Sequence, residues 1–154
     1  MRELRRQDRG IDEDEAMAQL SKAEYGVLST VSAKYEPYGV PLNFCVVDDC
    51  IYFHCAVEGQ KIDNITRNKS VSFCTVGTTE ILPEKFSTKY ESVIVSGDAE
   101  EVFGRDKQIA LEGLVHKYSP EFIDEGLKYI DDFRDTTRVF KIRISKLTGK
   151  ARNK

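Results

Sequence analysis

The residues best suited to chemistry lie in one stretch, Ile51 to Ser72, which reads IYFHCAVEGQKIDNITRNKSVS. A short apolar run leads to His54, a turn follows at residues 56–59, and Lys61 lies at the start of a predicted helix. A lysine at a helix N-terminus is well placed to bind phosphate, because the free N–H groups and the helix dipole attract anions there. The spacing therefore predicts a cradle for a phosphate-bearing cofactor, with an imidazole nearby.

His54 also has a simpler interpretation, as a surface histidine on the solvated side of a hairpin. If Asp48–Asp49 forms a two-residue turn, the flanking strands pair outward from it. This register puts Phe44 opposite Phe53 on an apolar face and Asn43 opposite His54 on the other face. His54 is thus predicted to point away from the core, where a ligand can reach it.

The cysteines and the remaining motifs supply no other clear chemistry. Cys45, Cys50, Cys55 and Cys74 lack CxxC and zinc-ribbon spacing, so they are interpreted as small, partly buried hydrophobic residues. A metal site of Cys45, Cys50 and His54 is a disfavoured alternative, and no metal is expected. The chain has no GxGxxG, Walker A, HExxH or GxSxG sequence, so enzymatic activity would depend on a bound cofactor.

Length and composition are typical of one soluble globular domain, here residues 1–154, with residues 1–10 expected to form a flexible arm. The net charge of -3 argues against nucleic-acid binding, because phosphate backbones favour a basic surface. We see no apolar run long enough for a signal peptide or a membrane span. We therefore expect no membrane association and a cytoplasmic location.

The pattern along the chain predicts a mainly β (α+β) protein whose strands are connected largely through hairpins. Pro41 interrupts one strand and predicts an edge strand, a bulge or a place where the backbone meets a ligand. Strands are expected at residues 25–32, 38–47, 50–55, 70–76, 89–102 and 136–146, and helices at 12–21, 58–68, 105–118 and 120–130. This order favours an antiparallel barrel or sandwich with helical insertions.

Several motifs in order resemble one family. They are YGVLSTV (25–31), GVPLNF (39–44), IYFHCA..GQK..NI.RN (51–68), VSF (71–73) and KF.T.YESVIVSG.AE (85–100). Together they resemble the pyridoxamine 5′-phosphate oxidase-like split-barrel family, specifically its nitroimidazole-resistance (Nim)-type branch. The resemblance covers residues 5–147.

The resemblance implies a six-stranded antiparallel split β-barrel with peripheral helices. It also implies a homodimer that holds flavin mononucleotide (FMN) at the subunit interface. Pro41, Leu42 and Asn43 would meet the flavin ring, while His54, Cys55 and Ala56 would line the ring and ribityl chain. Lys61 would bind the phosphate. A further set, from the partner subunit or beside the cleft, would be Lys85, Thr88, Tyr90 and Ser92.

The implied function is that of an FMN-dependent oxidoreductase. It would pass electrons from a nicotinamide to a small-molecule substrate such as a nitro-aromatic, a quinone or free flavin. His54 would be the catalytic residue, either as a proton donor or as an orienting hydrogen bond. The alternative is a non-catalytic flavin- or haem-binding module for storage or sensing, in which His54 could be an iron ligand. Oxidation of pyridoxamine phosphate is not expected, because no arginine-rich substrate motif is present near residues 138–152.

Overall fold

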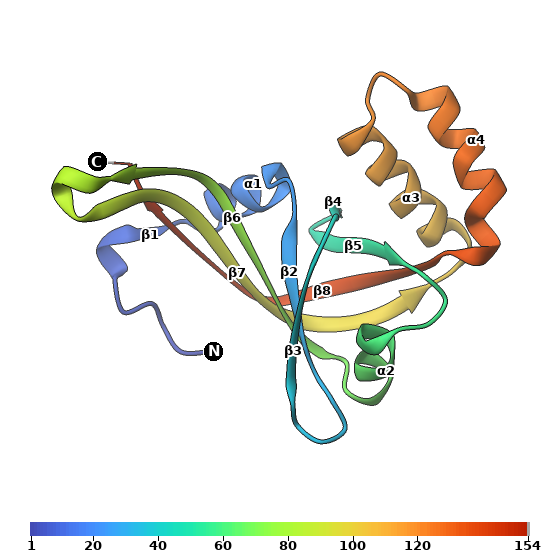
Figure 1. The fold of residues 1–154 in the computed structure, drawn as a ribbon, viewed down its shortest axis with the longest axis horizontal. Coiled ribbons are helices and arrows are strands. Elements are labelled where there is room, and N and C mark those ends of the chain that lie inside the picture. Colours follow the sequence, from blue (N-terminus) through green and yellow to red (C-terminus); the bar gives the residue numbers. More distant parts are fainter. Residues whose placement is uncertain (154) are drawn as a thin grey trace.

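The computed structural model describes residues 1–153 and contains one antiparallel sheet with the strand order β3-β2-β6-β7-β8-β5-β4 (Figure 1). The strands are β1 (Gly10–Ile11), β2 (Gly26–Val31), β3 (Pro37–Leu42), β4 (Cys45–Val47), β5 (Cys50–Cys55), β6 (Ser70–Leu82), β7 (Ser87–Val102) and β8 (Arg138–Arg152). The short strand β1 pairs with β8 beside this path. The helices are α1 (Glu13–Lys22), α2 (Gln60–Arg67), α3 (Gly104–Tyr118) and α4 (Ile123–Phe133). Three 3-10 turns complete the set: η1 (Gln7–Arg9), η2 (Pro83–Lys85) and η3 (Arg134–Thr136).

The expected mainly β architecture with peripheral helices is confirmed, but the strand count is not. The sheet has eight strands across residues 1–153 where six were expected. One addition is β1, and the other arises because the expected strand 38–47 is divided at Asn43–Phe44. Its two halves, β3 and β4, are the opposite edges of the sheet. Because only two residues join these edges, the sheet must curl back on itself, as in an open barrel.

The hairpin of β4 and β5 has the expected register close to its turn. Asp48 and Asp49 have φ angles of 49° and 59°, as a two-residue primed turn requires. Cys45 pairs with Tyr52 and Val47 with Cys50. The expected continuation to an Asn43–His54 pair is wrong. Residues before Phe44 leave this hairpin and pair with β2 instead, where Pro41 lies opposite Val27 on an edge strand.

The main core lies on the inner face of the curled sheet. Phe44, Phe53 and Phe73 are fully buried there, and the Phe44 and Phe73 rings meet edge to face at 4.9 Å. Helix α1 closes one side through Ala16 and Leu20, and its N-terminus is capped by Asp12, which accepts a hydrogen bond from the Glu15 N–H. Phe44 and Phe53 therefore both face inward, as expected.

A second apolar cluster lies on the outer face of β4 and β5, under helix α3. The Cys45 Sγ lies 3.5 Å from the Ala110 carbonyl of α3. In Figure 1 the helices α3 and α4 stand together above the end of the sheet that holds β5 and β8. The buried members are Cys45, Tyr52, Val102, Ala110, Leu111, Leu114, Ile130 and Val139. The outer face of the hairpin is therefore largely covered, which the strand alternation alone did not indicate.

The hairpin of β6 and β7 projects from the opposite end of the molecule (Figure 1). Ile81 is 75% exposed and Phe86, in the turn at the tip, is 97% exposed. No helix among residues 1–153 is long and apolar enough to cross a membrane.

Candidate functional site

His54 lies on β5 and lines a cavity of about 340 Å³ beneath helices α3 and α4. Strand alternation turns Phe53 and Cys55 into the main core, so His54 faces outward, as predicted. The cavity walls are mainly apolar and include Leu111 and Ile130 from the two helices. The imidazole thus stays solvent-accessible at the edge of an apolar space.

The protonation state of His54 follows from this position. Partial burial, and next the positive charge of Lys61, lower the pKa of His54 below its ordinary value of 6.5. The imidazole is therefore neutral at pH 7. A neutral imidazole offers one N–H donor and one nitrogen acceptor, which suits orientation of a ligand or coordination of a metal ion.

Lys61 lies in the first turn of α2, seven residues after His54. Residue 59, which precedes the helix, is a glycine with φ 153°, and its conformation is one that other residues rarely adopt. Among residues 1–153, no side chain caps this helix start, and a Cβ at Gly59 would meet nothing within 4 Å. The Ile62 N–H already donates to the Gly59 carbonyl. The N–H groups of the first two helical residues, Gln60 and Lys61, are thus left open beside the lysine side chain, so the residues present fit a phosphate group.

The segment Pro41–Asn43 comprises the end of β3 and the first of the two residues that join β3 to β4. Pro41 and Asn43 are exposed and, with Leu42 and Tyr25, line a shallow hollow. Leu42 also packs against the main core. Because this segment combines an exposed backbone with one buried anchor, it can offer main-chain groups to a flat ligand.

Two residues at the end of α3 hold this segment in place. Tyr118 Oη accepts a 3.1 Å hydrogen bond from the Phe44 N–H and donates one of 2.6 Å to the Glu24 carbonyl. Lys117 Nζ donates to the Phe44 carbonyl at 2.9 Å. Burial raises the pKa of Tyr118 above its ordinary value. No sequence motif marks these contacts, because they depend on tertiary packing.

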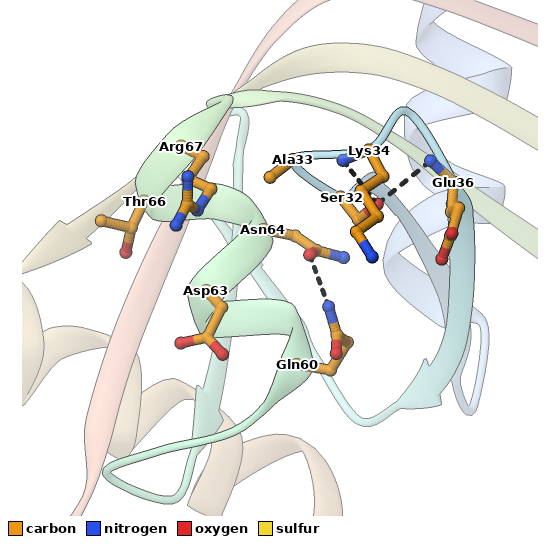
Figure 2. A pocket seen from close by; sticks show the side chains of 9 residues that line it. All are labelled: Ser32, Ala33, Lys34, Glu36, Gln60, Asp63, Asn64, Thr66 and Arg67. Atoms are coloured by element: carbon orange, nitrogen blue, oxygen red, sulfur yellow. Dashed lines mark hydrogen bonds between the residues drawn. The ribbon is translucent and has the colours of Figure 1, made fainter.

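A polar hollow of about 620 Å³ lies between α2 and the turn that joins β2 to β3 (Figure 2). Asn64, although 1% exposed, is fully engaged: it donates to Thr30 Oγ1 at 2.9 Å and accepts from Gln60 Nε2 at 2.7 Å. Ser32 Oγ accepts from two backbone N–H groups of the turn, so the turn is ordered internally. The hollow is lined by Ser32, Ala33, Lys34, Glu36, Gln60, Asp63, Asn64, Thr66 and Arg67. Lys61 does not line it, so the predicted phosphate site faces elsewhere.

The other predicted site residues fall into two groups. Cys55 is 8% exposed within the main core, so only its backbone is available to a ligand, whereas Ala56 is exposed in the turn before α2. The second group lies on the projecting hairpin, at the opposite end of the molecule from α3 and α4 (Figure 1), and consists of Lys85, Thr88, Tyr90 and Ser92. One chain does not bring these four residues to His54, and their place beside a flavin stays a prediction.

Within residues 1–153, no group of three or more His, Cys, Asp or Glu side chains lies close enough together to hold a metal ion. The second histidine, His116 on α3, is exposed, and its Nδ1 lies 2.9 Å from the Glu112 carbonyl.

Comparison with known proteins identifies the family. The pyridoxamine 5′-phosphate oxidase family model matches residues 12–151, so the chain belongs to this family. No curated protein matches the sequence.

Three solved structures show the same fold. A putative 5-nitroimidazole antibiotic resistance protein from Bacteroides thetaiotaomicron is 23% identical with a TM-score of 0.74, covering 92% of this chain and 85% of its own. An FAD-binding protein from Mesorhizobium loti is 23% identical with a TM-score of 0.61, covering 92% and 93%. An FAD and haem binding protein from Mycobacterium smegmatis is 14% identical with a TM-score of 0.71, covering 93% and 72%.

Proposed function

We propose that the chain is an FMN-binding homodimeric oxidoreductase that transfers electrons from a nicotinamide to a small acceptor. The observation that carries the proposal is the uncapped start of α2, where Lys61 and open N–H groups follow His54, the exposed residue on the outer side of β5. Family membership and the flavin-binding names of two structural neighbours support the choice of flavin. The acceptor belongs to the nitro-aromatics, the quinones or the free flavins.

Each residue has a defined task in this proposal. Lys61 and the first N–H groups of α2 bind the phosphate, and the backbone of Pro41–Asn43 supports the ring. The flavin, when bound, supplies the two-electron chemistry. His54 orients the acceptor through its neutral imidazole, and the apolar walls beneath α3 and α4 exclude water from that side.

Dimerisation is part of the same proposal. Ile81 and Phe86 on the projecting hairpin are largely exposed, and exposed apolar side chains grouped on one element are typical of an interface. A partner subunit that covers this hairpin would bring the second group of predicted residues, Lys85, Thr88, Tyr90 and Ser92, to the flavin cleft.

The absorption spectrum of the purified protein tests the choice of cofactor. We expect flavin bands, retention of added FMN, and oxidation of NADH or NADPH when a quinone or nitro-aromatic is added. A colourless protein that retains no added FMN would overturn the proposal. Measuring the molecular mass in solution tests the dimer separately.

A haem- or flavin-binding module without catalysis is the second candidate. A neutral imidazole at an apolar cavity is suited to bind iron, and one structural neighbour carries both FAD and haem in its name. A Soret band that is lost in His54→Ala would support this candidate. Turnover of a nicotinamide would favour the oxidoreductase.

A further inference from the structure

The cavity at His54 has the size and shape of a small-ligand site. Its volume of about 340 Å³ lies within the usual range for such sites. Its walls come from separate parts of the chain: β5 on one side, α3 and α4 on two others, and η3 at the end of α4. Since α3 and α4 pack through Val115 against Gly126, the two helices form one wall unit rather than separate surfaces.

The apolar part of the cavity is suited to an aromatic ring. Leu111 and Leu114 of α3 and Ile130 of α4 are nearly buried and supply flat aliphatic surface. Tyr129 and Phe133 also line the cavity, with ring centroids 4.5 Å apart, and they are 66% and 46% exposed. A pair of exposed aromatic rings beside an apolar cavity favours stacking with a planar guest.

The polar groups of the cavity indicate which charge a ligand would carry beside its aromatic ring. Among residues 1–153, Arg134 on η3 is the only residue lining the cavity that is charged at neutral pH, because the imidazole of His54 is neutral. No acidic residue in this described part of the chain lines the cavity. Arg134 Nη2 donates to Gln108 and to Asp131 Oδ1, the latter at 3.3 Å. Its Nε is buried and has no hydrogen-bond partner among residues 1–153.

This arrangement favours an anionic partner for Arg134. The Asp131 side chain is 73% exposed, and ion pairs at the surface are weak, so the contact is readily exchanged. A ligand carboxylate that takes the place of Asp131 would make a charge-assisted contact with the guanidinium.

We propose that the cavity between β5 and the α3–α4 pair binds a small aromatic carboxylate, with the carboxylate on Arg134 and the ring near His54. That such a compound is the electron acceptor rests on the proposed function. Binding of the carboxylate does not rest on the proposed function. Of the residues that line the cavity, only His54 is also a predicted flavin contact.

Calorimetric titration of the full chain with benzoate tests the proposal, and 4-nitrobenzoate serves as a reducible probe. We expect both to bind and benzamide, which has the same shape without the charge, to bind at least about tenfold more weakly. Arg134→Gln should weaken benzoate by a similar factor, whereas Arg134→Lys should retain part of the affinity. Arg105→Gln, an exposed arginine on α3 outside the cavity, is the matched control and should bind as the wild type does.

A variant that fills the cavity tests the need for the cavity separately from the need for the Arg134 charge. Thr136 lines the cavity and is exposed, so Thr136→Trp should place an indole near the site without disturbing the core, and binding of both carboxylates should be lost. Circular dichroism of each variant verifies that it is folded. Failure of the wild type to bind benzoate, or equal binding by wild type and Arg134→Gln, would overturn the proposal. Benzoate binding by a protein that retains no FMN would leave the cavity site standing and remove the proposed oxidoreductase function.

Discussion

Lys117 Nζ lies 3.7 Å from the centroid of the Phe44 ring and donates a hydrogen bond to the Phe44 carbonyl. One ammonium thus contacts both the side chain and the backbone of the residue that immediately precedes β4. Phe44 also closes the main core, so the last turn of α3 is linked to the centre of the barrel. The position of Pro41–Asn43 therefore depends on a helix more than seventy residues further along the chain.

Removing the Tyr118 hydroxyl should loosen this link. Tyr118→Phe takes away the acceptor of the Phe44 N–H and the donor to the Glu24 carbonyl. We expect a loss of about 1–2 kcal/mol in the free energy of unfolding, measured with urea. Tyr35→Phe is the control, because Tyr35 is 86% exposed. Equal stability of the two variants would show that the Tyr118 contacts contribute nothing.

Because of Lys117, the free energy of unfolding should depend on pH in the alkaline range. Burial lowers its pKa to about 8 from the ordinary 10.5, while the aromatic and carbonyl contacts favour the ammonium. Between these values the native state has lost the proton that the unfolded state still binds, so the free energy of unfolding rises with pH through this window. Lys117→Met should remove that increment, whereas Lys128→Met, on the exposed face of α4, should retain it. Identical pH dependence in Lys117→Met and the wild type would contradict the assignment.

The role of His54 can be read from the pH dependence of turnover. Because its pKa is lowered, the imidazole is neutral from pH 7 upward and becomes charged only below its ordinary value of 6.5. An orienting role predicts constant kcat/KM between pH 7 and 8 and a decline at acid pH. His54→Gln, which keeps an N–H donor, should retain more activity than His54→Ala. Activity that rises as the pH falls would instead identify His54 as a proton donor.

The sequence predicted well those features that local pattern controls. The Asp48–Asp49 turn, the pairing of Cys45 with Tyr52, and the inward side of Phe53 follow from turn chemistry and strand alternation. The helix predicted at residues 58–68 is present as α2, and its apolar residues Ile62 and Ile65 are buried. Pro41 lies on an edge strand, one of the three outcomes its position allowed.

The features that tertiary packing controls were not predicted. The break at Asn43–Phe44 moves β3 to the far edge of the sheet, and alternation cannot distinguish a long strand from two short ones in the same phase. The packing of α3 and α4 against the outer face of β5 depends on contacts between apolar residues that are far apart in the sequence. Arg134 in the cavity was missed for the same reason, since it follows the end of α4 and no motif marks it.

The central claim is that Lys61 at the start of α2 holds the phosphate of FMN. The most direct test is titration of wild type and Lys61→Ala with FMN and with riboflavin, which has the same ring and no phosphate. Loss of a charge-assisted contact of about 1.5–3 kcal/mol predicts FMN binding about ten- to a hundredfold weaker in Lys61→Ala. Riboflavin binding should be unchanged, and Lys69→Ala, whose side chain is 73% exposed beyond the end of α2, should bind both as the wild type does. Equal FMN affinity in wild type and Lys61→Ala, or an equal loss for FMN and riboflavin, would contradict the account.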